Sequence, residues 1–127
     1  MRQLLHPPLD EVTVEAILHA LADPVRVALY AEIVRSAAAR SCSILLDLSR
    51  KAVPKSTLSQ HFKVLREAGL IRSERCGVEM RNSSRGDEIE QRFPGLIAAI
   101  LGAHHAQREA EVRRSRSGRR GPSRSAR

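Results

Sequence analysis

One stretch of the chain, residues 55–71, constrains the fold more than any other. Its apolar positions recur at the spacing of one buried helix face: Leu58, Phe62 and Leu65. Ser56 is a good N-cap, because its hydroxyl can accept a hydrogen bond from a backbone N–H of the first turn. Gly69 stands where a helix ends in the left-handed conformation that glycine adopts at the least cost. The pattern predicts an amphipathic helix over 56–68.

The opposite face of this predicted helix carries short polar side chains and one cation, with no acid before Glu67: Thr57, Ser59, Gln60 and Lys63. An acid-free face suits insertion among the phosphates and base edges of DNA. A polar helix that only faces solvent usually mixes both charge signs, and the pattern alone leaves that alternative open. We expect this face to contact DNA.

The positive charge of the chain is concentrated at its C-terminal end. The chain has a net charge of +8, and residues 113–127 contribute seven arginines and no acid. Residues 1–112 have 15 basic and 14 acidic residues. For binding to nucleic acid, the positions of the charges within residues 1–112 therefore matter more than their sum. The mixture of Arg, Ser, Gly and Pro from Arg113 onward predicts a disordered tail over 113–127, because it buries too little apolar surface to fold.

Composition narrows the class of protein. A chain of 127 residues is most simply one domain. With two Phe, one Tyr and no Trp, its core must be aliphatic, which favours packed helices. We expect no membrane span, since no run approaches about 20 apolar residues. We also expect no secretory signal and no disulfide framework from two cysteines, and hence a cytoplasmic protein.

The sequence before residue 55 predicts an arm and three helices. Residues 1–12 show no periodic spacing of apolar residues, which predicts a flexible arm. A helix from about Thr13 carries an apolar face: Val14, Ile17, Leu18 and Leu21. Asp23-Pro24 starts a second helix that runs to about Ala38. Ser41 or Ser43 caps a short third helix, whose inward residues are Ile44, Leu45 and Leu48.

After Gly69 the apolar period changes to that of strands. Residues 70–75 and 78–82 predict a β-hairpin around Cys76-Gly77, with the glycine at positive φ. This region is basic and carries Arg72, Arg75, Arg81 and Arg85. Helix, short turn, helix and basic hairpin form the order of a winged helix-turn-helix. The predicted fold class is mainly α with a small β-hairpin, in one domain over 13–112.

Pro94 predicts the start of a last helix that runs toward Val112. This helix has a long apolar stripe: Leu96, Ile97, Ile100, Leu101 and His104. Such a stripe is more apolar than a terminal helix on a small monomer requires, which indicates an association surface, and cyclic dimers are the commonest outcome. We expect the stripe to pair with the first helix.

Two segments carry a resemblance to a known family. Residues 20–26 (Ala-Leu-Ala-Asp-Pro-Val-Arg) and 55–71, followed by the hairpin, resemble the ArsR/SmtB winged-helix repressors. The resemblance spans about residues 13–105. It implies a homodimer built from the first and last helices, recognition of double-stranded operator DNA by helix 56–68 in the major groove, and repression relieved by a signal. The dimerisation residues would be Val14, Ile17, Leu18, Leu21, Leu96, Ile97, Ile100, Leu101 and His104.

The resemblance also assigns DNA-binding positions, and their chemistry suggests roles. Gln60 can make paired hydrogen bonds to adenine, and Ser59 can reach base edges or phosphate. For His61, contact with DNA and packing at the core edge both stay open. The full expected set, which includes backbone contacts from the helix and from the hairpin, is Lys55, Ser56, Thr57, Ser59, Gln60, His61, Lys63, Arg75 and Arg81.

No metal site or cofactor is expected. Metal-sensing members carry a Cys-x-Cys pair before the recognition helix, where this chain has Ser43 and Leu45 beside the single Cys42. The other family site uses the last helix, but its upstream histidine ligand has no counterpart for His104, His105 and Glu109.

The expected function is therefore a dimeric repressor released by an unidentified signal. No carboxylate pair, nucleophile–base set or glycine-rich phosphate loop points to an enzyme. Two alternatives stay open. One is a metal- or thiol-responsive sensor of the same fold, in which Cys42 or Cys76 acts as a redox switch or His104 and His105 contribute to a metal site. The other is a nucleic-acid-binding accessory protein led by its basic tail.

Overall fold

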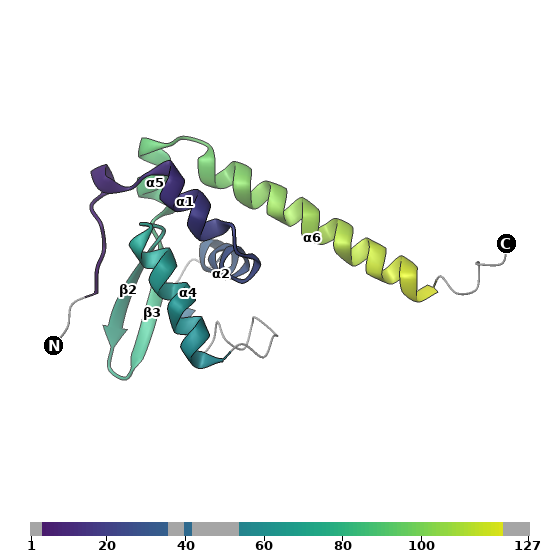
Figure 1. Cartoon of the computed structure of the whole chain (residues 1–127), viewed down its shortest axis with the longest axis horizontal. Coiled ribbons are helices and arrows are strands. Elements are labelled where there is room, and N and C mark those ends of the chain that lie inside the picture. The colour runs from purple at the N-terminus through teal and green to yellow at the C-terminus, as the bar shows by residue number, and fades with distance from the viewer. Residues whose placement is uncertain (1–3, 36–39, 42–53, 121–127) are drawn as a thin grey trace.

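The computed structural model describes residues 4–35, 40–41 and 54–120 (Figure 1). These residues form a mainly helical domain with a small antiparallel sheet, as predicted. In chain order the elements are η1 (Leu9–Glu11), α1 (Val14–Leu21), α2 (Pro24–Arg35), β1 (Arg40–Ser41), α4 (Lys55–Glu67), β2 (Ile71–Cys76), β3 (Glu79–Ser84), α5 (Gly86–Arg92) and α6 (Leu96–Arg120).

The first two helices begin at the predicted places, and a side chain caps each of them. The Thr13 hydroxyl accepts a hydrogen bond of 3.1 Å from the backbone N–H of Ala16, at the start of α1. One carboxylate oxygen of Asp23 accepts from the N–H groups of Val25 and Arg26 at 2.8 and 3.1 Å, at the start of α2. The predicted end of the second helix at Ala38, and the predicted third helix, lie outside the described residues.

The start of α4 differs from the prediction. The helix begins at Lys55, and its N-cap is Pro54 rather than Ser56. The Pro54 carbonyl accepts the first helical hydrogen bond from the Leu58 N–H at 2.9 Å. Proline has no N–H to satisfy, so it begins a helix at little cost. Ser56 lies in the first turn with its side chain exposed, and the capping role predicted for it is wrong.

The end of α4 is the glycine cap that the pattern predicts. Gly69 has a φ of 89°, in the left-handed region. Its N–H donates to the Arg66 carbonyl at 3.1 Å, and the next N–H, from Leu70, donates back to the Leu65 carbonyl at 3.0 Å. This pair of bonds is a Schellman motif, which satisfies carbonyls that the helix end leaves free. The motif turns the chain directly into β2.

The hairpin is confirmed, and a third strand accompanies it. β2 and β3 pair antiparallel with Cys76 opposite Glu79, so that Gly77, at a φ of 67°, and Val78 form the turn. The two residues of β1 add to the other side of β3, which gives the strand order β1-β3-β2. β1 was not predicted, because two residues are too few to show an alternating pattern.

The last helix starts later than predicted. Pro94 and Gly95 form the centre of a turn in which the Leu96 N–H donates to the Phe93 carbonyl at 3.2 Å. Proline followed by a glycine at positive φ, here 83°, is the signature of a type II turn. Pro94 therefore ends the preceding segment, and α6 begins at Leu96.

α6 also continues past residue 112, to Arg120. The prediction of disorder from Arg113 is therefore wrong for 113–120, while 121–127 lie outside the described residues. Alanine and arginine are strong helix formers, and cations near a helix C-terminus interact favourably with its dipole. The composition of this segment shows that it cannot form a hydrophobic core of its own. A segment without a core can still extend a helix that has already formed.

Residues 4–12 pack onto the domain, although 1–12 was predicted to be a flexible arm. His6 Nε2 accepts a hydrogen bond of 3.0 Å from the backbone N–H of Ser73, on β2. The Pro7 carbonyl accepts from Arg85 at 2.8 Å, and Val12 is buried. We call residues 4–12 the N-terminal arm. These contacts have no sequence period, and for this reason the pattern did not reveal them.

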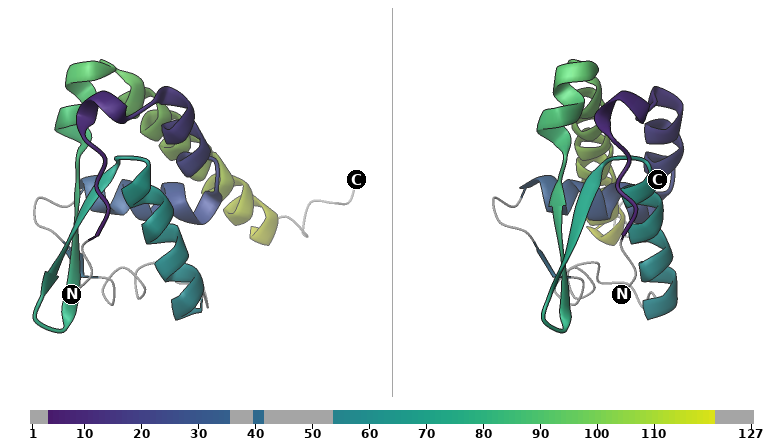
Figure 2. Two further views of the ribbon diagram at one scale, coloured as in Figure 1. Left: turned by 60° about the vertical axis from the view of Figure 1, so that its left-hand side comes forward. Right: turned by 90° about the vertical axis from the view of Figure 1, so that its left-hand side faces the viewer.

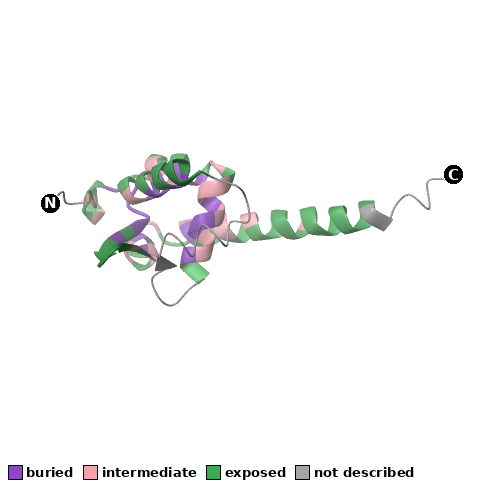
Figure 3. Ribbon diagram, turned by 90° about the horizontal axis from the view of Figure 1, so that it is seen from below, coloured by how far each residue is buried: buried purple, intermediate pink, exposed green. Residues whose placement is uncertain are grey.

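The core lies where α1, α2 and α4 meet the base of the hairpin and α5. α2 contacts α1, α4, β3 and α6, and it holds these elements around one cluster. The largest side chains with essentially no exposed surface are Tyr30, Ile17, Leu65, Leu70, Ile71 and Ile89. After its first turns α6 leaves this body and projects as an exposed helix (Figure 3). None of the described helices combines the length and the hydropathy needed to cross a membrane.

Candidate nucleic-acid interface

The polar face of α4 lies on the surface of the molecule. The three apolar side chains of the predicted stripe are buried, as expected. In α4, which is described throughout, the first turn holds no acidic residue. The exposed side chains of its first three turns are Lys55, Ser56, Thr57, Ser59, Gln60 and Lys63. These residues form one continuous polar surface, which we call the α4 face.

The turn of the hairpin lies on the same side of the molecule as the N-terminal end of α4 (Figure 2). Arg75 on β2 and Arg81 on β3 are both exposed. A nitrogen of Arg81 lies 3.7 Å from a carboxylate oxygen of Glu79, and both side chains are about half exposed. An ion pair so exposed contributes little to stability, so a phosphate can replace it. The hairpin arginines and the α4 face are therefore available to one ligand.

Arg72 lies at the base of the hairpin. Sequence analysis placed it in this basic region, and the structure pairs it with Glu88 of α5 at 3.4 Å. Glu88 also accepts hydrogen bonds from the buried Arg85, at 3.2 and 2.8 Å. These bonds from Arg85, opposed by partial burial and assisted by Arg72, hold the pKa of Glu88 below its ordinary value. Glu88 thus shares its single negative charge between Arg85 and Arg72.

His61 is half-buried at the edge of the α4 face. Its Nδ1 lies 3.4 Å from Nη1 of Arg26, a residue of α2. Sequence analysis missed Arg26, because the segment from Asp23 to Arg26 showed only the start of a helix. The signal that could have revealed it is an arginine in the first turn of a helix, where a cation is unfavourable unless other groups hold it.

Asp23 lies close enough to this cluster for the charges of His61 and Arg26 to act on its carboxyl group. Partial burial pushes the pKa of Asp23 upward, but the backbone N–H groups of Arg26 and Val25 donate to its carboxylate. The net effect is a pKa below the ordinary value, so Asp23 stays charged at neutral pH. Its charge anchors the start of α2 and hence the position of Arg26.

The predicted dimerisation residues divide into two groups. Ile17, Leu21 and Ile97 are buried in the core of the single chain. Their part in a dimer interface stays a prediction. The remaining positions keep some exposed surface: Val14, Leu18, Leu96, Ile100, Leu101 and His104. Leu18 is the most accessible large one, at 49% exposed.

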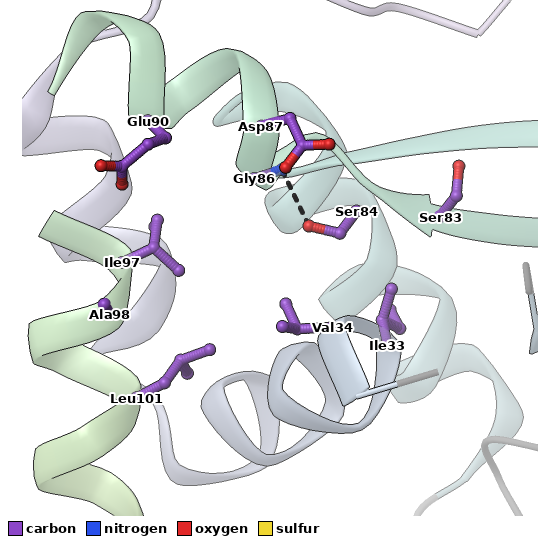
Figure 4. Close-up of a pocket in the computed structure, with 10 residues that line it drawn as sticks. All are labelled: Ile33, Val34, Ser83, Ser84, Gly86, Asp87, Glu90, Ile97, Ala98 and Leu101. Atoms are coloured by element: carbon purple, nitrogen blue, oxygen red, sulfur yellow. Dashed lines mark hydrogen bonds between the residues drawn. The ribbon is translucent and has the colours of Figure 1, made fainter. Parts of the chain in front are cut away.

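A pocket of about 490 Å³ lies away from the α4 face, between α2, β3, α5 and α6 (Figure 4). Its apolar wall includes Ile33, Val34, Ile97 and Leu101, and the carboxylates of Asp87 and Glu90 also line it. Ser84 joins the wall to the core, since its hydroxyl lies 3.0 Å from the Tyr30 hydroxyl and accepts from the Gly86 N–H at 2.8 Å. The pocket therefore connects the base of the hairpin to α6.

The sensor residues weighed from sequence are only partly visible. Cys76 is exposed at the end of β2, next to the hairpin turn, and Cys42 lies outside the described residues. His105 pairs with Glu109 at 3.2 Å on the surface of α6. Within the described part of the chain, no group of three or more His, Cys, Asp or Glu side chains is placed to hold a metal ion.

Comparisons with known proteins agree with this geometry. Residues 21–74 match a family described as a helix-turn-helix domain. An ArsR-like transcriptional regulator from Rhodococcus sp. RHA1 superposes with a TM-score of 0.52 at 26% sequence identity, covering 79% of this chain and 89% of that one. The M. tuberculosis protein Rv0081 superposes with a TM-score of 0.53 at 28% identity, covering 80% of this chain and 98% of that one. A search of curated proteins finds no match.

The fold and the exposed α4 face together define a winged helix-turn-helix protein of the DNA-binding class. Both solved structures are similar to this chain over most of its length, and one of them is described as an ArsR-like transcriptional regulator.

Proposed function

We propose that the chain acts as a homodimeric repressor that binds double-stranded operator DNA. The observation that carries this proposal is the exposed, acid-free face of α4 on the same side as the hairpin arginines. In this arrangement α4 enters the major groove and the hairpin contacts the flanking backbone. Two copies related by a two-fold axis place their α4 helices in successive major grooves about 34 Å apart.

The residues of the interface have distinct roles in this proposal. Gln60 hydrogen-bonds an adenine edge, and Ser59 contacts a base edge or a phosphate. The remaining residues hold the phosphate backbone, which sets the register without reading sequence. These are Lys55, Ser56, Thr57, Lys63, Arg75 and Arg81.

The dimer is supported by the shape of α6. This helix leaves the body of the single chain with Ile100, Leu101 and His104 half-buried and Val112 45% exposed. A second copy would cover these positions together with Leu18 of α1. A protein that regulates an operator works where the DNA lies, and we accordingly place this one in the cytoplasm.

The signal that releases the operator is part of the same proposal. The pocket between α2, β3, α5 and α6 favours a small molecule, because its volume falls in the range of ligand sites. A ligand there would lie between the hairpin base and the helix that carries the dimer. A thiol signal is the alternative, favoured by the exposure of Cys76.

The proposal is tested by comparing two substitutions on selected and random DNA. An operator is first obtained by selection from random duplexes. Gln60→Ala should reduce the preference for that operator by about 5- to 150-fold, since one paired base contact contributes about 1–3 kcal/mol of discrimination. Arg81→Ala should weaken binding to all duplexes alike and reduce the salt slope by about 1.

Gln107→Ala is the matched control, because Gln107 is exposed on α6 and distant in sequence from the α4 face. It should change neither quantity. The proposed reading role is wrong if Gln60→Ala reduces operator and random binding equally. Selection that enriches no duplex would contradict the DNA-binding proposal itself.

Removal of residues 113–127 separates a repressor from an accessory protein led by its basic end. We expect the shortened chain to bind more weakly, because fewer counterions are released, but to retain its preference for the operator. Loss of all binding would favour the accessory protein. Fluorescence anisotropy at several salt concentrations measures both outcomes.

A further inference from the structure

Arg26 is held rigidly between two helices. Its Nε donates to the Ala20 carbonyl at 2.7 Å, and Nη2 donates to the His19 carbonyl at 3.3 Å. These carbonyls belong to the last turn of α1, where carbonyls lack the usual helical partner four residues on and attract cations; the His19 carbonyl also accepts from the Ala22 N–H. The backbone N–H of Arg26 donates to Asp23. The guanidinium is thus fixed in position by contacts that do not involve α4.

The remaining Nη1 of Arg26 points to the α4 face. It lies 3.4 Å from Nδ1 of His61, the residue that follows Gln60. Arginine keeps all its protons and has no acceptor, so in this pair the guanidinium must donate and Nδ1 must accept. In a neutral imidazole one nitrogen accepts and the other carries the proton. Arg26 therefore selects the tautomer of His61 in which Nε2 carries the hydrogen.

The second nitrogen is available for a ligand. Among the residues that the structure describes, the Arg26 contact is the hydrogen bond that His61 makes, and Nε2 has no partner. The half-buried ring therefore keeps one nitrogen that no described residue contacts.

We propose that His61 reads the operator as an Nε2–H donor, with Arg26 as the positioning residue that sets this tautomer. The recognised group is an acceptor on a purine in the major groove, where adenine and guanine both present N7 and guanine adds O6. The His61 side chain lies about 100° around α4 from that of Gln60, so the two would contact different bases. This inference rests on the proposed function and adds a base contact to it.

Two isosteric substitutions separate the nitrogens of His61. In His61→Gln the side-chain amide reaches about the position of Nε2 and keeps a donor there. In His61→Asn the amide reaches only the position of Nδ1, so it keeps a partner for Arg26 but loses the donor. On the selected operator at pH 8 we expect His61→Gln to bind within about 3-fold of the wild type. We expect His61→Asn to bind about 10-fold more weakly, as for one lost base contact.

The chemical nature of the acceptor is tested on the DNA. Replacing single purines of the operator by their 7-deaza analogues removes N7 and retains base pairing. At one position this replacement should weaken the wild type about 10-fold and leave His61→Asn unchanged. If His61→Asn instead weakens operator and random duplexes equally, the contact is to phosphate and base reading by His61 is wrong.

A double-mutant cycle separates positioning from stability. Arg26→Met removes the donor to Nδ1, and it also removes the side-chain donor to the Ala20 carbonyl, whereas the His19 carbonyl still accepts from the Ala22 N–H. A purely structural defect would weaken operator binding equally in the wild-type and His61→Gln backgrounds. Positioning predicts a loss of about 3- to 10-fold in the wild type and a smaller loss with His61→Gln, because glutamine has no tautomer to set.

The outcomes distinguish this inference from the proposed function. Operator selection without effect of either His61 variant would overturn the inference and leave the repressor in place. Equal losses in both arms of the cycle would overturn the role of Arg26 alone. Failure of the wild type to select any operator would remove both.

Discussion

At the scale of single residues, the contact between Gly69 and Val12 shows how closely the N-terminal arm fits the domain. Gly69 ends α4 at positive φ, and a Cβ built on it would overlap Cγ2 of the buried Val12. Gly77 also has positive φ, but a Cβ there would meet nothing within 4 Å. Both glycines therefore need a positive φ, but only at Gly69 would a side chain also collide with a neighbour.

This difference predicts unequal effects of Gly69→Ala and Gly77→Ala on the free energy of unfolding. Gly77→Ala should lower it by about 1–2 kcal/mol, the cost of a left-handed L-residue. Gly69→Ala should lower it by about 2–5 kcal/mol, because overpacking against Val12 adds to that cost. Urea unfolding followed by circular dichroism measures both. Equal losses would mean that the arm does not hold Val12 against Gly69 in solution.

At the scale of elements, one of the hydrogen bonds that attach the N-terminal arm depends on the charge of the His6 ring. His6 Nε2 must accept from the Ser73 N–H, and a protonated ring cannot accept. Burial, followed by the charges of Arg72, Arg66 and Arg85 and opposed by Glu74, lowers the pKa of His6 from its ordinary 6.5. The neutral ring is therefore the form that the fold stabilises.

We expect the stability of the protein to fall as the pH drops from above 6.5. Between the lowered pKa of folded His6 and the value of 6.5 in the unfolded chain, the unfolded state binds more protons, so stability rises with pH there. In His6→Gln the amide oxygen can still accept from Ser73 but does not titrate, so this variant should match the wild type at pH 8 and lose less at pH 5.5.

His6→Ala is the second comparison. It removes the bond at every pH, so it should lower the free energy of unfolding by about 1 kcal/mol at pH 8 and by less at pH 5.5. Burial also lowers the pKa of His104, which leaves some pH dependence in all variants. If His6→Gln shows the full pH dependence of the wild type, His6 is not its cause.

At the scale of the whole molecule, most of α6 lacks contacts with the rest of the single chain. Ile97 joins the core, and α6 then projects away from the body with Val112 exposed (Figures 1 and 3). Surface pairs such as Gln107 with Glu111 and Arg108 with Glu111, at 3.5 and 4.0 Å, give such a helix only modest support. A second copy of the chain would supply the missing contacts.

The proposed dimer predicts different effects of Leu18→Asp and Leu5→Asp. Both leucines are exposed in the single chain, 49% and 63%, so neither change should unfold it. Leu18 lies on the proposed interface, where a buried carboxylate should weaken the dimer by about 10-fold or more and weaken operator binding with it. Leu5 lies on the arm and should be neutral. Sedimentation equilibrium would contradict the proposed interface if Leu18→Asp dimerised like the wild type.

The sequence alone determined the features that depend on a few neighbouring residues. Thr13 and Asp23 mark helix starts, Gly69 marks a helix end, and Gly77 marks the hairpin turn, because caps and turns are satisfied by groups within one or two turns of chain. The stripe of Leu58, Phe62 and Leu65 oriented α4 for the same reason, since its period is set by helix geometry.

Only the tertiary structure decided which distant groups meet. The Ser73 N–H and His6 are 67 residues apart, and Arg26 and His61 are 35 apart. No local pattern encodes such pairs, because each depends on where the whole fold places an unsatisfied donor or acceptor. α4 begins at Lys55 because the Pro54 carbonyl accepts the first helical hydrogen bond, although Ser56 is the better capping side chain. α6 runs to Arg120 because residues 113–120 continue a helix that has already formed.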